Sequence, residues 1–263
     1  MASHPPGQCC TQGVRHTGEA KGEFVDIKGI KTYVSTPKSG DKSLAIIILP
    51  DVIGNEFINA QLISDQFAAN NYYTVMPDLF QGDPVKLNRP EGFDIMEWLQ
   101  KGGPEGKGHL PNSVDPIVEK TLAWMKEQGV KKVGAVGYCF GGKYVCRFLA
   151  KGKGVDVGYT AHPSFVDEAE VKGITGPLSI AAAGMLQGNG AQTEKRRQTE
   201  DILKEMKVPY QMSLYSDVEH GFAVRADLSK KSVKFAKEAA FLQAVQWFDE
   251  FLKGDRSSAT PAE

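Results

Sequence analysis

Several features that would identify a membrane or nucleic-acid-binding protein are missing from this sequence. The longest aliphatic run, residues 45–49, is far too short to cross a bilayer. Neither sign of charge dominates, because 31 basic residues are balanced by 32 acidic residues, and no block of like charge occurs. The sequence therefore predicts no membrane partner and no nucleic-acid partner.

Cysteine is also scarce, with four residues in a chain of 263. So few thiols do not form a disulfide framework, and the N-terminal decapeptide MASHPPGQCC lacks the apolar stretch of a secretory signal. We therefore expect a cytoplasmic location. Cys9 and Cys10 could be a redox pair or metal ligands, but no histidine or cysteine partner lies at zinc-like spacing. Two ordinary thiols are the better interpretation, and we expect neither a metal nor a cofactor.

What the sequence does contain is an alternation of short apolar segments with helical patterns. It predicts an α/β fold with a mainly parallel sheet flanked by helices, in one large domain over residues 22–253. A flexible N-terminal arm (1–21) and a polar C-terminal tail (254–263) flank that domain. Strands are predicted at Glu23–Ile27 and Ile30–Ser35, as a hairpin, and at Leu44–Leu49, 73–76, 133–136, Val157–Ala161, Leu178–Ala183 and Tyr210–Tyr215; helical patterns cover 58–67, 93–99, 118–125, 144–149, 202–206 and 233–252.

Residues 132–149, KVGAVGYCFGGKYVCRFL, join a buried strand to a helix through a turn flanked by glycines. This is the pattern of the G-x-S-x-G nucleophile elbow, with Cys139 in place of serine. Gly137 and Gly141 allow a turn tight enough to raise one side chain above the sheet, and the amides of the following helix favour a thiolate there. A buried cysteine that packs as a small hydrophobic residue is the alternative. The surrounding strand and helix favour Cys139 as a nucleophile.

The motif GYCFGG, together with HGF at residues 220–222, resembles the dienelactone hydrolase family, in particular its fungal branch. The resemblance covers residues 22–253. It implies an α/β-hydrolase fold and a small-molecule substrate, such as a lactone, ester or thioester, that forms an acyl-enzyme at Cys139.

His220 follows the last predicted strand, so it is expected at the same sheet edge as the elbow. Imidazole titrates in the range needed to take the thiol proton, and the HGF match favours His220 as the base rather than as a surface histidine. His162 also ends a strand near the elbow. We interpret it as a pocket wall or a structural hydrogen-bonding residue.

The acid of a catalytic triad is where the sequence departs from the family. The family has an aspartate soon after the strand Leu178–Ala183, but residues 184–193, GMLQGNGAQT, contain no acidic residue. Asn189 or Gln187 could still orient His220, although neither can supply a charge. Asp217 and Glu219 are close to His220 in sequence and are further candidates.

Other pocket residues are assigned through the resemblance. The amides of Phe140 and Ile53 are the expected oxyanion donors. Asp51 matches a glutamate that pairs with the resting nucleophile, and Arg225 matches an arginine that grips the substrate carboxylate, with an exposed surface role as its alternative. Lesser candidates for substrate binding are Tyr144 and Arg89, the latter at the start of a long, mobile, glycine-rich excursion (89–108) expected to form a pocket wall.

Three functions remain open from the sequence. The first is a cysteine hydrolase of a small lactone, ester or thioester metabolite. The second is a repurposed enzyme of fungal secondary metabolism that catalyses cyclisation, isomerisation or C–C cleavage, because the triad acid is missing. The third is a non-catalytic ligand binder or thiol redox sensor. The sequence does not distinguish a monomer from a homodimer.

Overall fold

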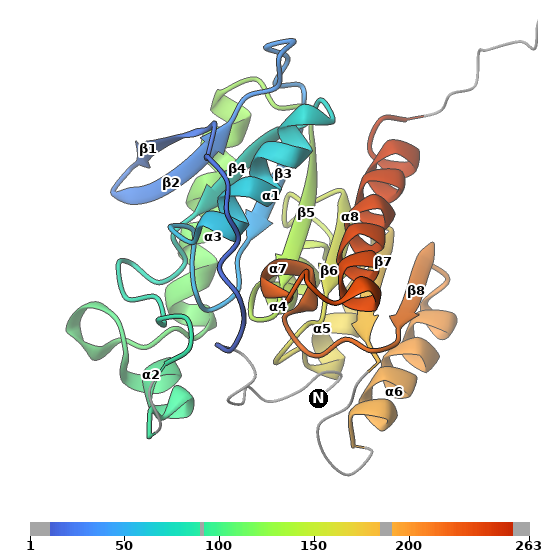
Figure 1. Cartoon of the computed structure of the whole chain (residues 1–263). Helices are drawn as coiled ribbons and strands as arrows, with labels where there is room; N and C mark the ends of the chain where they lie inside the picture. The colour runs from blue at the N-terminus through green and yellow to red at the C-terminus, as the bar shows by residue number, and fades with distance from the viewer. Residues whose placement is uncertain (1–10, 90–91, 185–190, 255–263) are drawn as a thin grey trace, which may run out of the picture.

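The computed structural model describes residues 11–89, 92–184 and 191–254, and these residues form one eight-stranded sheet (Figure 1). The strand order is β1-β2-β4-β3-β5-β6-β7-β8. β1 (Glu23–Ile27) pairs antiparallel with β2 (Ile30–Ser35), and β2 pairs antiparallel with β4 (Tyr73–Pro77). The other pairings are parallel. The antiparallel pairing of β1 with β2 confirms the predicted hairpin, and the parallel pairings confirm the mainly parallel sheet. They involve β3 (Leu44–Leu49), β5 (Lys132–Tyr138), β6 (Val157–Ala161), β7 (Leu178–Ala183) and β8 (Tyr210–Tyr215).

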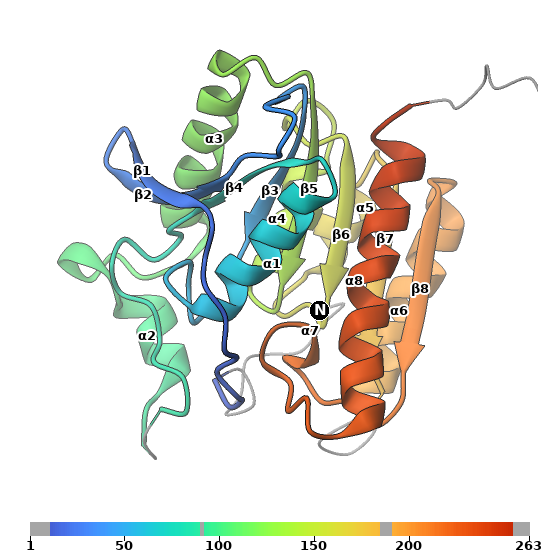
Figure 2. The same ribbon diagram turned by 45° about the horizontal axis from the view of Figure 1, so that its top comes forward.

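Helices cover both faces of the sheet, as a parallel sheet requires (Figure 2). On one face lie α1 (Ile58–Ala69), α7 (Phe222–Arg225) and α8 (Lys231–Phe251). On the other lie α3 (Pro111–Glu127), α4 (Gly141–Phe148), α5 (Glu168–Lys172) and α6 (Ala191–Met206). Because both faces are covered, β3 is a continuous aliphatic run whose residues 45–49 are fully buried.

The central strand β5 is longer than the sequence pattern indicated. We expected it over residues 133–136, but Gly137 and Tyr138 still pair with Thr160 and Ala161 of β6. The glycine that opens the turn motif is therefore the penultimate residue of the strand. The turn begins only at Cys139, at the sheet edge where the parallel strands have their carboxyl ends.

Residues 11–22 lie along the body of the protein, from α7 past α1 (Figure 1). The Val14 N–H donates to Arg225 O at 2.9 Å. The Asn59 side-chain amide donates to Val14 O at 2.8 Å and to Val224 O at 3.0 Å. Asn59 and the α7 backbone thus satisfy both main-chain polar groups of Val14 and bond this part of the arm to the body of the protein, while the flexibility of the arm stays a prediction. Residues 1–10 lie outside the described residues.

The excursion that contains α2 (Ile95–Lys101) and the 3₁₀ turn Pro104–Gly106 is also anchored in its described part. His109 is fully buried, and its ring lies 4.3 Å from that of Trp98. Asp83 fixes both residues, since its carboxylate bonds to His109 Nε2 at 3.1 Å and its carbonyl accepts from Trp98 Nε1 at 3.0 Å. Asp83 therefore holds α2 and His109 against the body of the protein, and the mobility of the excursion stays a prediction.

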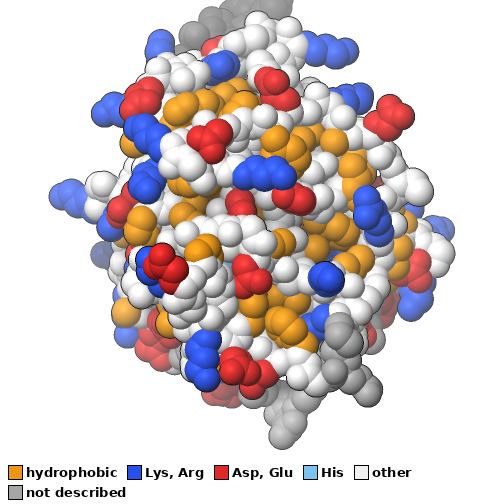
Figure 3. Space-filling view, turned by 90° about the vertical axis from the view of Figure 1, so that its left-hand side faces the viewer, with side chains coloured by type: hydrophobic (Ala, Val, Ile, Leu, Met, Phe, Trp, Pro, Cys, Tyr) orange, Lys and Arg blue, Asp and Glu red, His pale blue; other side chains and the backbone are white. Residues whose placement is uncertain are grey.

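Acidic and basic side chains are interspersed over the side of the molecule drawn in Figure 3, with apolar side chains between them. This mixture agrees with the balanced composition of the chain. Within the described residues, no helix combines the length and the apolar composition that crossing a membrane would require.

Candidate active site

The turn between β5 and α4 has the geometry of a nucleophile elbow. Cys139 has φ +52°, a left-handed conformation that is uncommon for a residue with a side chain. An added Cβ on Gly141 would lie 1.9 Å from Leu49 O, and one on Gly137 would lie 2.6 Å from Gly141 O. Both glycines are therefore needed for α4 to pack closely on β3 and β5. The predicted strand, sharp turn and helix are all present.

Cys139 is 1% exposed, and the loop after β6 packs directly on it. Its sulfur lies 3.7 Å from Ser164 Oγ, and the Ser164 N–H donates to Cys139 O at 2.9 Å. Ser164 is not among the site residues that the sequence predicts. A signal for Ser164 in the sequence is its position two residues after His162, in the loop that follows β6. That strand is the neighbour of the elbow strand β5.

The structure brings both candidate histidines together. His220 is half-buried in the turn between β8 and α7, and its ring centroid lies 4.9 Å from that of His162 in an edge-to-face arrangement. His162 is 4% exposed with φ +40°, and its N–H donates to Ala181 O at 2.8 Å. Phe222 packs on the same imidazole at 5.6 Å. His162 is therefore a direct neighbour of His220.

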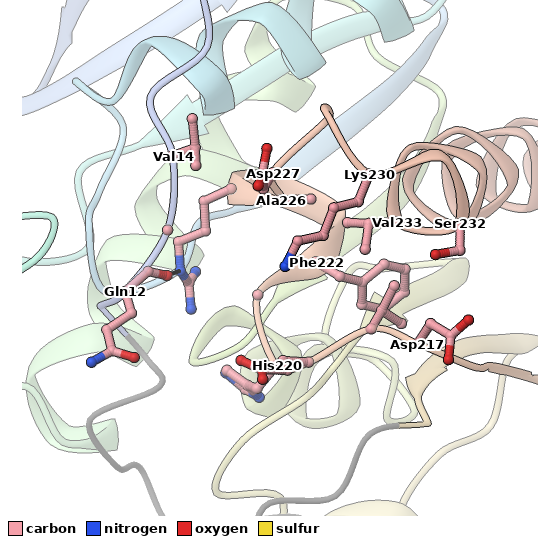
Figure 4. Close-up of a pocket in the computed structure, with 15 residues that line it drawn as sticks. Gln12, Val14, Asp217, His220, Phe222, Ala226, Asp227, Lys230, Ser232 and Val233 are labelled. Carbon is pink, nitrogen blue, oxygen red and sulfur yellow. Dashed lines mark hydrogen bonds between the residues drawn. The ribbon is translucent and has the colours of Figure 1, made fainter.

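Neither acidic residue near His220 in sequence takes the place of a triad acid. Asp217 and Glu219 are both described and exposed, and neither makes a hydrogen bond or an ion pair with His220. In Figure 4 the Asp217 carboxylate lies apart from the His220 ring. The other two candidates, Gln187 and Asn189, lie outside the described residues.

Asp51 and Arg225 form a buried ion pair, with each side chain 1% exposed. Asp51 uses one oxygen for the guanidinium of Arg225 and the other to accept from the Ile53 N–H at 3.1 Å. Arg225 also donates from Nε to Gln12 O at 2.8 Å. A buried guanidinium needs a counter-charge, which explains why Asp51 is directed to Arg225. The Ile53 N–H, an expected oxyanion donor, is thus already hydrogen-bonded to Asp51 in this structure.

A cavity of about 430 Å³ opens beside this ion pair. Figure 4 shows Gln12 and Val14 on one side of it and Lys230 and Val233 on the other, with His220 between them at its base. Arg225 also lines the cavity, whereas Cys139 does not. The walls come from the N-terminal arm, the turn after β8, α7 and the start of α8, and not from the α2 excursion.

Two further candidates lie away from this cavity. Tyr144 is fully buried beside Phe140, at 5.1 Å between ring centroids, and its hydroxyl has no partner among the described residues. Burial raises the pKa of Tyr144 well above its usual value. Arg89 donates to Phe93 O at 3.0 Å, and its guanidinium lies over the Phe93 ring. The described residues contain no cluster of histidine, cysteine and acidic side chains suited to a metal ion.

Comparison with known proteins agrees with the fold. A solved structure of a putative dienelactone hydrolase from Klebsiella pneumoniae has a TM-score of 0.67 at 16% identity, covering 88% of this chain and 98% of that one. This similarity confirms the predicted α/β-hydrolase fold.

Two fungal relatives are similar in sequence over nearly their whole length. Hydrolase tropI of Talaromyces stipitatus is 52% identical, covering 96% of this chain and 99% of the relative. Hydrolase pyvD of Aspergillus violaceofuscus is 50% identical, covering 96% of this chain and 100% of the relative. The model of the dienelactone hydrolase family matches residues 30–252. The chain therefore belongs to the dienelactone hydrolase family, which is a family of enzymes.

Proposed function

We propose that this protein is a cysteine-dependent hydrolase that acts on a small lactone, ester or thioester through an acyl-enzyme at Cys139. The observation that carries the proposal is the left-handed backbone of Cys139 at the apex of a strand–turn–helix elbow. A second observation supports it. His220 lies in the turn after β8, at the same sheet edge, and lines a cavity large enough for a small metabolite.

In the proposed reaction, His220 accepts the thiol proton of Cys139, and the thiolate forms a C–S bond with the substrate carbonyl carbon. The charge that develops on the carbonyl oxygen is stabilised by the N–H of Phe140, which donates to no other described residue. The bond from the carbonyl carbon to the leaving group then breaks, and the leaving group takes the proton from His220. Water attacks the acyl thioester, which releases a carboxylic acid and restores the thiol.

The ion pair between Asp51 and Arg225 favours a substrate that carries an anionic group. Such a group would compete with Asp51 for the guanidinium of Arg225. Once displaced, Asp51 would also release the Ile53 N–H, to which its second oxygen is bonded. Binding of an anionic substrate would thereby complete a pair of oxyanion donors with Phe140.

A trapping experiment tests the proposal. A panel of small esters, lactones and thioesters, with p-nitrophenyl acetate as the simplest member, is incubated with the protein and with Cys139→Ala, and intact masses are recorded. We expect an acyl adduct on the parent protein and none on the variant. An adduct that persists on Cys139→Ala, or product formed equally by both proteins, would contradict the proposal.

The base assignment needs its own comparison. We expect His220→Ala to abolish turnover and His162→Ala to reduce it less, because only His220 shares the thiol proton in the proposed reaction. Circular dichroism establishes that both variants are folded. Equal losses in the two folded variants would mean that the roles of the two histidines are wrongly ranked.

A second candidate function is a non-hydrolytic reaction of a metabolite, such as cyclisation, isomerisation or C–C cleavage. It is favoured by the absence of any bond from Asp217 or Glu219 to His220, together with a loop over residues 184–193 that contains no acid. A metabolite screen on the parent and Cys139→Ala distinguishes the two functions. A product that depends on Cys139 and has not gained the elements of water relative to the substrate supports the second function. Ligand binding without a product would instead indicate a non-catalytic binder, and a Cys139 that responds only to oxidant would indicate a redox sensor.

A further inference from the structure

The loop after β6 is fastened to the elbow on both sides of Ser164. Before Ser164, Ala161 O accepts from the Cys139 N–H at 3.3 Å. At Ser164, the main-chain N–H donates to Cys139 O at 2.9 Å. After Ser164, Phe165 O accepts from Lys143 Nζ of α4 at 3.0 Å. These three bonds fix the position of Ser164 relative to Cys139.

The same loop contains backbone conformations that need support from their surroundings. His162 has φ +40° and Phe165 has φ +62°, and neither residue is a glycine. Such conformations are unfavourable for residues with a Cβ and persist where the surrounding structure imposes them, often at functional sites. The approach of α4 is also close, since an added Cβ on Gly142 would lie 2.7 Å from Pro163 Cβ. Strain and close packing thus coincide in residues 162–165, the part of the loop that contains Ser164.

Ser164 is fully buried, and its Oγ lies 3.7 Å from the sulfur of Cys139, within hydrogen-bonding distance for sulfur. A thiolate at a site as buried as Cys139 loses most of its contact with water, so a donor beside it favours the charged form. A hydroxyl can be that donor at any pH at which the enzyme is folded. The titratable groups on the described loops at this sheet edge include Asp51 after β3, Asp78 after β4, His162 after β6, and Asp217, Glu219 and His220 after β8.

We propose that Ser164 is a positioning residue for the nucleophile. Its hydroxyl donates to the sulfur of Cys139, holds the side chain in one orientation and stabilises the thiolate before a substrate arrives. This inference rests on the proposed role of Cys139 as the nucleophile. It adds a donor that is independent of His220 and of any group that orients His220.

The test is the pH profile of Cys139 alkylation by iodoacetamide, resolved by peptide mass spectrometry. Ser164→Ala removes only the hydroxyl and keeps the main-chain bond to Cys139 O. We expect the Cys139 alkylation rate at neutral pH to fall about tenfold, with the profile displaced to higher pH, since a hydrogen bond to a charged group is lost. Ser164→Thr restores a hydroxyl and should recover most of the rate. Should Ser164→Ala fail to fold, Ser164→Gly removes the same hydroxyl.

Ser179→Ala is the matched control. Ser179 is equally buried on the neighbouring strand β7, but its hydroxyl bonds to Gln211 and Gln243. The pH profile of Cys139 alkylation in Ser179→Ala should match that of the parent protein. A parent-like profile in folded Ser164→Ala would overturn the inference while leaving Cys139 as nucleophile. A parent protein whose Cys139 is unreactive, with activity unchanged in Cys139→Ala, would overturn the proposed function and this inference together.

Discussion

At the scale of single residues, two cysteines with almost equal burial are expected to behave differently. Cys139 is 1% exposed and Cys146 is 3% exposed, so access alone does not separate them. Burial raises the pKa of the Cys146 thiol to about 12, with a further contribution from Glu170. Cys139 instead precedes the first turn of α4, where the helix amides favour a thiolate.

We therefore predict that a limiting amount of iodoacetamide labels Cys139 before Cys146. Cys139 should also react before Cys9 and Cys10, which precede the first predicted strand and lie outside the described residues. Site-resolved peptide mass spectrometry measures the order of labelling. Faster reaction of any other cysteine by a wide margin would remove the chemical support for the elbow.

The buried ion pair gives a second residue-scale prediction. Asp51→Asn leaves the guanidinium of Arg225 buried without a counter-charge, and breaking such a pair costs about 3–5 kcal/mol of unfolding free energy. Urea unfolding measures the loss. The matched control is Glu127→Gln, which breaks a pair with Lys28 in which both side chains are 57% exposed and should cost less than about 1 kcal/mol. Equal stability of the two variants would show that Asp51 does not compensate Arg225.

At the scale of elements, the packing of the α2 excursion depends on the buried side chain of His109 in its neutral form. Burial lowers the pKa of His109 from its ordinary value, and the bond from Asp83 opposes that shift only in part. Between the folded pKa and the unfolded pKa, the unfolded chain binds more protons than the folded protein. The contribution of His109 to stability is therefore present above the unfolded pKa and is lost as the pH falls through this window.

We predict that His109→Gln flattens the dependence of stability on pH between about pH 5 and about pH 7.5. Urea unfolding at the two pH values gives the change in unfolding free energy with pH for the parent and for the variant. Packing lost in the variant lowers its stability equally at both pH values, so it does not affect this change. Lys28→Gln, an exposed substitution, should retain the parent slope. If the pH dependence of the unfolding free energy is unchanged in His109→Gln, groups other than His109 cause the loss of stability at acidic pH.

At the scale of the whole molecule, the open matter is whether the scaffold still hydrolyses esters efficiently. If residues 184–193 supply no acid, His220 lacks a charged partner from that loop, and loss of a triad carboxylate can cost about 10⁴-fold in rate. We predict slow hydrolysis of p-nitrophenyl acetate by the parent protein and faster hydrolysis by Gln187→Asp or Asn189→Asp. Initial rates for the three proteins provide the measurement.

Two results would contradict this prediction. Brisk hydrolysis by the parent would mean that another group already orients His220. No gain in either variant would mean that the loop does not bring these positions within hydrogen-bonding reach of the imidazole. In a scaffold that has moved away from hydrolysis, the same substitutions should leave the natural reaction unchanged or slower.

The sequence by itself determined the elements and the order in which they occur. The bounds of β1, β2, β3, β6, β7 and β8 were predicted residue for residue, because the period of apolar side chains and the turn residues are local properties of the chain. The elbow at Cys139 was predictable for the same reason, since its glycines, strand and helix are contiguous. Even β5 was correct in place and short only at its ends.

Only the tertiary structure decided which distant groups meet. Asp51 and Arg225 are 174 residues apart, and nothing in either local pattern shows that Asp51 turns toward Arg225 and toward the Ile53 amide. The anchoring of the arm by Asn59 and of α2 by Asp83 likewise depends on polar groups from separate elements. The contact between Ser164 and Cys139 exists because β5 and β6 are neighbours in the sheet. Burial imposes these pairings, since a polar group removed from water must find whichever partner the folded chain places beside it.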